Sequence, residues 1–241
     1  MIRNIFFLSI FISQISFSQI GEFGISLDVA NLQGEFRENV KRPGIGLGMN
    51  GIYYLPSIPS IGVGAHLGFL NYGSVEDKIP FPGTFGTVNI LMNRQNNILV
   101  YQLLAKISPH LSVVNPYIEI FGGGHNLSTQ TSLKSEFYNN NNEPNEIARS
   151  ENSSDNVLSY GFGLGGEIKI SSSYITNDLT LDSTSYDLFL NFGFKMIRGG
   201  IAKYLTEDAV KGIDANNNPI YDFKKSRTDF SIIQIGASFV F

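Results

Sequence analysis

The sequence predicts an all-β fold: an eight-stranded antiparallel up-and-down transmembrane β-barrel that follows an N-terminal signal peptide. Three observations support this prediction. Eight segments alternate between apolar residues and small or polar ones, the apolar stripes contain no Asp, Glu, Lys, Arg or His, and the connections between the segments alternate between long and short. A tilted strand that spans a bilayer needs about 9–11 residues, with apolar side chains at alternate positions.

The first 18 residues have the features of a signal peptide. Arg3 supplies a positive charge, an apolar run covers residues 5–17, and Ser16 and Ser18 are small residues at −3 and −1 from a cleavage site. A retained membrane anchor is the alternative, but the run is too short to span a bilayer well. We therefore expect residues 1–18 to be removed and residues 19–241 to form the barrel domain.

The apolar stripes are the main evidence for the barrel. Read at alternate positions, they cover residues 23–29, 45–53, 61–69, 99–107, 118–124, 160–170, 186–196 and 233–241. A Lys or Arg on the lipid face near the bilayer midplane costs roughly 2–4 kcal/mol, whereas strands of a soluble β-sandwich carry charges freely on their water-facing side. A sandwich would have to bury all eight stripes in one core, so the barrel is the favoured fold.

The opposite faces of the same strands carry the ionisable side chains. These are Asp28, His66, Lys106, Glu119, Glu167, Lys169, Asp187 and Lys195, with many glycines between them. The interior of an eight-stranded barrel is just wide enough to be filled by side chains, and a buried charge is expensive unless it is paired. We expect each of the three lysines to lie within reach of one of the four carboxylates, so that the lumen is closed.

The connections predict which end of the barrel faces which side of the membrane. The long links are residues 31–44, 71–97, 125–156 and 198–227, and the short links are residues 55–60, 108–115 and 171–184. In outer-membrane barrels the long loops are extracellular and the short turns periplasmic. With an even number of strands, both termini are then expected in the periplasm.

The last eight residues, QIGASFVF, carry a short motif at the end of the chain. Gln234, Gly236, Phe239 and Phe241 resemble the C-terminal insertion signal that the assembly machinery of bacterial outer-membrane barrels recognises. The chain as a whole resembles small outer-membrane β-barrel families of the Bacteroidetes type, with an OmpA-, OmpX- or OmpW-like architecture. This resemblance implies residence in the outer membrane, with outer-membrane lipids and the assembly machinery as partners.

Composition limits the chemistry that the chain can perform. The formal net charge is −4 with scattered basic residues, which argues against nucleic acid as a partner, and there is no cysteine for disulfides or lipid attachment. The three histidines are not clustered in the sequence, so we expect neither a zinc site nor another cofactor.

One segment is spaced like the start of a calcium-binding loop, with Asp214, Asn216 and Asn218 at alternate positions. Pro219 stands where such a loop requires glycine, so a hairpin turn is favoured over a calcium site.

Three classes of function remain open. The favoured one is a structural or interaction barrel with a closed lumen, a class that includes accessories of larger envelope complexes. The first alternative is an OmpW-like narrow conduit for small apolar molecules, which requires an apolar lumen. The second is a lipid-modifying enzyme that uses His125 with Ser128, but two strand residues three positions apart point to opposite faces. We therefore expect no enzymatic activity.

Overall fold

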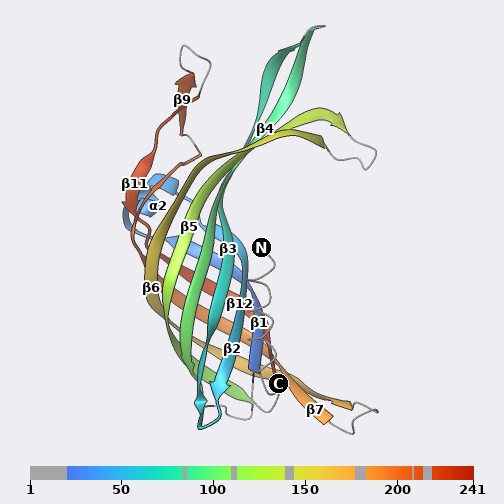
Figure 1. Cartoon of the computed structure of the whole chain (residues 1–241), viewed down its shortest axis with the longest axis vertical. Coiled ribbons are helices and arrows are strands. Elements are labelled where there is room, and N and C mark those ends of the chain that lie inside the picture. Colours follow the sequence, from blue (N-terminus) through green and yellow to red (C-terminus); the bar gives the residue numbers. More distant parts are fainter. Residues whose placement is uncertain are drawn as a thin grey trace, which may run out of the picture.

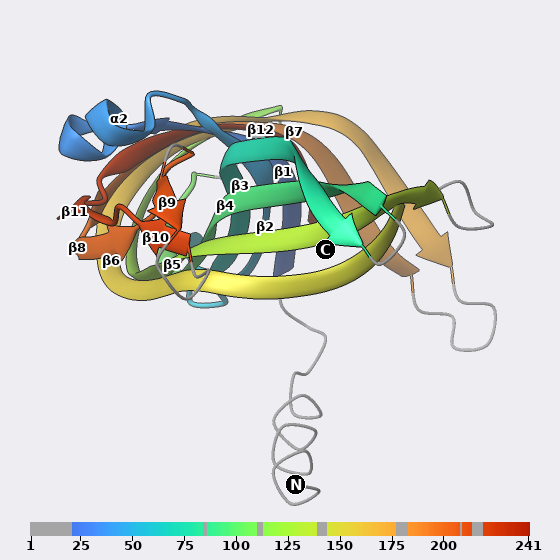
Figure 2. The ribbon, with the colours of Figure 1, turned by 90° about the horizontal axis from the view of Figure 1, so that it is seen from above.

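The computed structural model describes residues 21–83, 86–109, 113–138, 144–176, 183–207, 209–213 and 219–241. Eight strands form a closed antiparallel barrel in the order β1-β12-β7-β6-β5-β4-β3-β2 (Figures 1 and 2). The predicted fold class is therefore confirmed. The predicted signal peptide lies outside the described residues, and among the described residues no helix is long and apolar enough to cross a membrane.

The barrel strands differ in length. They are β1 (Gly21–Leu32), β2 (Gly44–Leu55), β3 (Ile58–Gly83), β4 (Gly86–Ile107), β5 (Val114–Tyr138), β6 (Pro144–Thr176), β7 (Ser183–Gly199) and β12 (Phe230–Val240). The first and last of them close the barrel, with Phe23 opposite Phe239 and Asp28 opposite Gln234. Closure gives every strand two neighbours and so leaves no open edge in the barrel wall.

Strands β3 to β6 extend far beyond the predicted boundaries. β3 and β4 stay paired up to Gly83 and Gly86, and β5 and β6 up to Tyr138 and Pro144, so most of residues 71–97 and 125–156 is strand. Assigning these two segments to long loops was therefore wrong. The apolar stripe ends where the strands leave the barrel body, but residues 128–132 read Ser-Thr-Gln-Thr-Ser, and paired strands accept such polar residues on both faces. Figure 1 shows the two long hairpins projecting from one end, the hairpin end, opposite the C-terminus.

A compact cap lies at the hairpin end. It contains helix α2 (Gly34–Val40) and the strand pair β8 (Ile201–Tyr204) and β11 (Lys224–Arg227). The Phe36 ring is fully buried, with its centroid 5.7 Å from that of Tyr72 and 4.9 Å from that of Tyr204, both at edge-on angles. These three aromatic rings come from α2, β3 and β8, so they join three distant segments over the barrel. The second small pair, β9 (Val210–Ile213) with β10 (Pro219–Tyr221), lies further out.

The outer wall of the barrel is apolar, whereas its charged side chains lie inside, among buried apolar side chains such as Leu70 and Leu104. Outward residues of the predicted stripes are strongly exposed, for example Leu27 at 63%, Leu103 at 73% and Ile120 at 66%. Inward residues on the same strands, such as Asp28 and Lys106, are buried. A water-soluble protein rarely exposes so many large apolar side chains, and the alternation of exposed apolar with buried charged side chains matches that of a lipid-embedded barrel.

Candidate functional site

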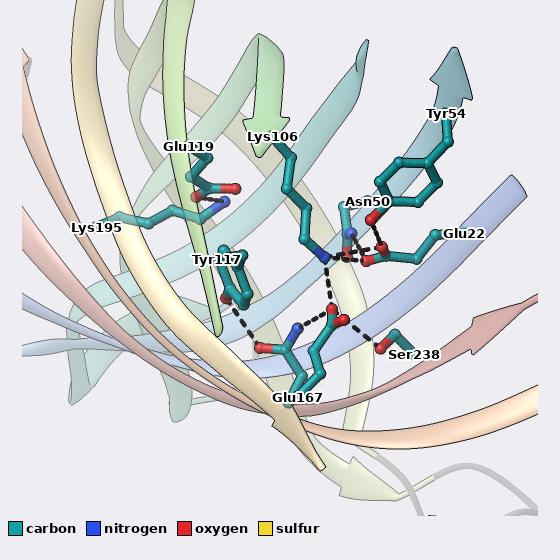
Figure 3. Close-up of polar contacts among 10 residues, drawn as sticks. Glu22, Asn50, Tyr54, Lys106, Tyr117, Glu119, Glu167, Lys195 and Ser238 are labelled. Carbon is teal, nitrogen blue, oxygen red and sulfur yellow. Dashed lines mark hydrogen bonds and ion pairs between the residues drawn. The ribbon is translucent and has the colours of Figure 1, made fainter. Parts of the chain in front are cut away.

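The centre of the lumen is a buried ionic network around Lys106, called here the Lys106 network. The Lys106 ammonium on β4 donates to both carboxylate oxygens of Glu22 on β1, at 2.9 and 2.8 Å, and to Glu167 Oε1 on β6 at 2.6 Å (Figure 3). All three side chains are at most 3% exposed. One lysine therefore ties together three strands that lie around the barrel wall.

Neutral donors surround the two carboxylates of this network. The Tyr54 hydroxyl donates to Glu22 Oε2 at 2.5 Å and Asn50 Nδ2 donates to Glu22 Oε1 at 3.3 Å. Glu167 Oε1 accepts from Asn191 Nδ2 at 3.0 Å and from Ser238 Oγ at 3.4 Å. The network holds two carboxylates and one ammonium, and these donors stabilise the remaining negative charge because hydrogen bonds to a carboxylate are stronger than neutral ones.

Two further ion pairs extend the filling of the lumen. Lys195 Nζ on β7 lies 3.1 Å from Glu119 Oε1 on β5, with both side chains 5% exposed. Lys169 Nζ on β6 lies 2.7 Å from Asp187 Oδ2 on β7, at the end that holds the chain termini, where the side chains are 28% and 32% exposed. Each of the three predicted inward lysines thus contacts at least one carboxylate.

Asp28 and His66 are buried but do not join these ion pairs. Asp28 Oδ1 accepts hydrogen bonds from Ser26 Oγ at 2.6 Å and Gln234 Nε2 at 2.9 Å. Asp28 Oδ2 and His66 Nε2 have no hydrogen-bond partner within the described part of the chain. The structure therefore places both residues on the inner face, as the sequence suggests, but no described lysine forms an ion pair with either of them.

The sequence analysis missed Glu22, which is a central member of the Lys106 network. Glu22 immediately precedes the apolar stripe 23–29 and belongs to the opposite, inward parity. Extending the strand by one residue would have identified it, because the same alternation assigns Asp28 to the interior. Tyr54 was also missed, as was Tyr117, whose ring centroid lies 4.4 Å from Lys106 Nζ and whose hydroxyl donates to Asn191 Oδ1 at 3.1 Å. The alternation pattern was applied to charged residues alone, yet buried tyrosines need a hydrogen-bond partner as well.

The four residues of the C-terminal motif lie along the seam that closes the barrel. Gln234 points inward to Asp28, whereas Phe239 and Phe241 are exposed outside at 38% and 50%. A Cβ atom at Gly236 would lie 2.1 Å from the carbonyl oxygen of Ile25, so only glycine allows this approach of β12 to β1. Gly236 therefore has a structural role in closure besides any role in recognition.

Phe241 is joined to the other end of the barrel domain. Its N–H donates to Gly21 O at 2.9 Å, and its carbonyl oxygen accepts from Gly21 N at 2.6 Å. The Phe241 ring lies over Gly21, where a Cβ atom would be 2.8 Å from Cε2. The last residue thus completes the ladder between the first and last strands.

The histidine considered for catalysis, His125, is buried and forms a hydrogen bond that holds the fold. His125 is fully buried, and its Nε2 lies 2.7 Å from Thr228 Oγ1, which itself donates to Gly200 O at 3.0 Å. His125 is thus held by a hydrogen bond to Thr228, the residue two positions before β12. Strand β5 runs straight through His125 and Ser128, so the two point to opposite faces and form no catalytic pair.

No candidate metal centre is found among the described residues. They contain no group of three or more His, Cys, Asp or Glu side chains placed to hold an ion. Asp214, Asn216 and Asn218 lie outside the described residues, as does His110. On either side of this segment β9 and β10 pair antiparallel, with Pro219 opposite Ile213.

Comparisons with known proteins find structural similarity without significant sequence similarity. No protein family model matches the sequence, and no curated protein matches it. Among solved structures, the chain is similar to Ail, the attachment invasion locus protein of Yersinia pestis, at 8% identity over 92% of this chain and 99% of that chain, with a TM-score of 0.46. It is also similar to Neisserial surface protein A (8% identity, 92% and 95% covered, TM-score 0.37) and to a major outer membrane protein from Thermus thermophilus (13% identity, 92% and 99% covered, TM-score 0.39). The assignment of this chain as an eight-stranded barrel rests on its own strand pairing.

Proposed function

We propose that this chain is an integral outer-membrane β-barrel protein with a closed lumen and a structural or interaction role. The observation that carries this proposal is the inverted distribution of side chains: an apolar outer wall around an interior of paired charges. The functional regions of such a protein lie outside the lumen, in the long hairpins, the cap and the lipid-facing surface. The termini would face the periplasm and the hairpin end the outside of the cell.

The outer wall is too apolar to be a water-exposed surface. Large side chains such as Leu47 at 63% and Ile118 at 57% are exposed on the barrel strands. Soluble monomers rarely expose a contiguous apolar patch larger than a few hundred Å². A bilayer covers such a surface without cost, and the signal-peptide features of residues 1–18 provide the route of export.

The alternative functions have less support. A conduit for small apolar molecules requires an apolar passage, whereas the inner wall presents Glu22, Lys106 and Glu167 at its centre and the buried Phe36 in the cap. A lipid-modifying hydrolase or acyltransferase requires a nucleophile beside a base, and His125 instead hydrogen-bonds Thr228 within the wall. A non-enzymatic barrel that needs no cofactor is the function we favour.

Membrane residence gives a direct test of the proposal. We expect the mature protein to be found in the outer-membrane fraction and to migrate differently in detergent gels before and after boiling, because the closed ladder resists detergent at room temperature. A sample unfolded in urea and left unboiled is the control and should migrate like the boiled one. A mature protein that is soluble in the periplasm without detergent would contradict the proposal.

Because the lumen is closed, the barrel should not conduct ions. Planar bilayers that contain the refolded protein should show no stable conductance above that of the protein-free membrane, because Lys106 and Lys195 with their carboxylate partners fill the interior. The measurement is made at several voltages, since a plug held only by loops can be displaced. A large and steady open level at low voltage would show that the lumen is a pore.

A further inference from the structure

The wall formed by β7 and β12 continues beyond the apolar belt as the small β8–β11 ribbon. β7 ends at Gly199 and β8 begins at Ile201, while β11 ends at Arg227 just before β12 begins at Phe230. Figure 2 shows the ribbon at one side of the barrel, next to β6. Its two faces differ: Ala202, Tyr204 and Ser226 are buried against the cap, whereas the other face is exposed.

The exposed face of this ribbon carries a concentration of positive charge. We call Arg198, Lys203, Lys225 and Arg227 the outer basic patch. Lys203 and Lys225 are direct cross-strand partners, and Arg227 is the partner of Ile201. Like charges placed directly opposite each other on paired strands repel, which destabilises the pairing unless an anion lies between them.

Among the residues that the structure describes, the carboxylates near the outer basic patch pair with its two arginines or with groups outside the patch, and none of them pairs with the ammonium groups of its two lysines. Asp229 accepts from Arg198 at 2.8 Å and lies 3.7 Å from Arg227, and Asp222 lies 3.0 Å from Lys224. Asp155 accepts a hydrogen bond from the backbone N–H of Lys203, at 2.8 Å, rather than from its ammonium.

Neither lysine of the opposed pair has a carboxylate partner within the described part of the chain. The Lys203 ammonium lies 3.7 Å from the ring centroid of Phe223, and Lys225 forms no hydrogen bond or ion pair with any residue that the structure describes. The two cations are thus exposed and without a neutralising group among those residues.

The patch begins where the apolar belt ends. Arg198 follows the outward Phe194 and Met196 on β7, and its partner on β6 is Tyr160, which is 65% exposed. Leu158, at 84%, and Ile201, at 60%, lie beside it on the outside. Aromatic and basic side chains together above an apolar stripe are typical of the level of lipid headgroups.

We infer that the outer basic patch binds the phosphate-bearing headgroup of a lipid in the outer leaflet, with an acyl chain lying along Leu158, Tyr160 and Ile201. Phosphate oxygens accept charge-assisted hydrogen bonds from arginine and lysine, and an anion between Lys203 and Lys225 removes their mutual repulsion. This inference rests on the proposed function, because it requires the barrel to stand in the outer membrane. The inference adds to the proposed function the class of lipid that is bound and the position of its binding site on the barrel wall.

Lipid retention tests this inference. The mature chain is refolded into phosphatidylcholine nanodiscs with or without diphosphoryl lipid A, re-extracted in neutral detergent and measured for bound lipid by native mass spectrometry. We expect the wild-type barrel to retain lipid A in preference to phosphatidylcholine, and the double variant Lys203→Gln/Lys225→Gln to retain roughly tenfold less. The matched control is Lys134→Gln/Arg149→Gln, which removes two charges from the β5–β6 hairpin and should retain lipid A like the wild type.

The possible outcomes separate this inference from the proposed function. Each variant is first shown to fold by its heat-dependent gel shift in phosphatidylcholine alone; a wild-type chain that fails there refutes the proposed function. A wild-type barrel that folds but retains no lipid A, or a double variant that retains as much as the control, overturns only the lipid site. Loss of a dimer instead of lipid in the double variant would show that the occupant is a second copy of the chain.

Discussion

Replacing Lys106 with methionine should lower the free energy of unfolding by about 3–5 kcal/mol. The ammonium contacts both Glu22 and Glu167, which are buried at the centre of the lumen. Methionine has a similar length but supplies no charge or donor, so two carboxylates would remain close together without their shared counter-ion. Removing one partner of a buried ion pair is far more costly than removing the whole pair, because the other charge stays buried.

The measurement is urea unfolding of the refolded protein in detergent micelles, followed by the gel shift. Lys169→Met is the matched control: its pair with Asp187 lies at the rim and is about a third exposed, so its loss should cost only ~0–1 kcal/mol. The triple variant Glu22→Gln/Lys106→Met/Glu167→Gln should recover much of the lost stability, since no unpaired charge remains. If Lys106→Met unfolds at the same urea concentration as Lys169→Met, the Lys106 network does not hold the barrel together.

Removing the Phe241 ring should reduce the amount of assembled protein in cells several-fold while changing the stability of the assembled barrel little. The ring is half exposed, so its loss should cost less than the ~1.5–3 kcal/mol that full burial of an apolar side chain contributes. The substitution Phe241→Ala keeps the backbone hydrogen bonds to Gly21, so the ladder itself stays intact. Any large effect must then arise before the barrel closes, when the terminal strand is still free to be recognised.

Two measurements on the same variant separate these stages: the yield of heat-modifiable protein in cell membranes, and the urea midpoint after refolding in detergent. Phe23→Ala is the matched control, because Phe23 lies opposite Phe239 across the seam and is similarly exposed at 46%, but belongs to the first strand. It should show a comparable stability change and normal assembly. Equal membrane yields of the two variants, or a Phe241→Ala protein that cannot refold in detergent, would assign the ring to stability instead of recognition.

The alternation of residue types alone predicts which face of each barrel strand meets lipid and which faces the lumen. This information is local: a strand places successive side chains on opposite faces, so a period of two residues can be read without knowing any partner strand. The stripes 23–29 and 61–69 are outward, and Lys106 and Glu119 are inward, as the alternation predicts. The number of barrel strands followed from the same pattern, because each spanning segment needs its own stripe.

Which charges meet and where the strands end can be seen only in the folded barrel. Lys106 lies 84 residues from Glu22 and 61 from Glu167, and their contact depends on the register of neighbouring strands around the closed ring, which no local pattern encodes. The extensions of β5 and β6 carry polar runs such as residues 128–132 and so lack the apolar stripe that would reveal them. The cap likewise exists because Phe36, Tyr72 and Tyr204 bury one another's rings: three segments far apart in the chain gain stability only once the barrel has brought them together.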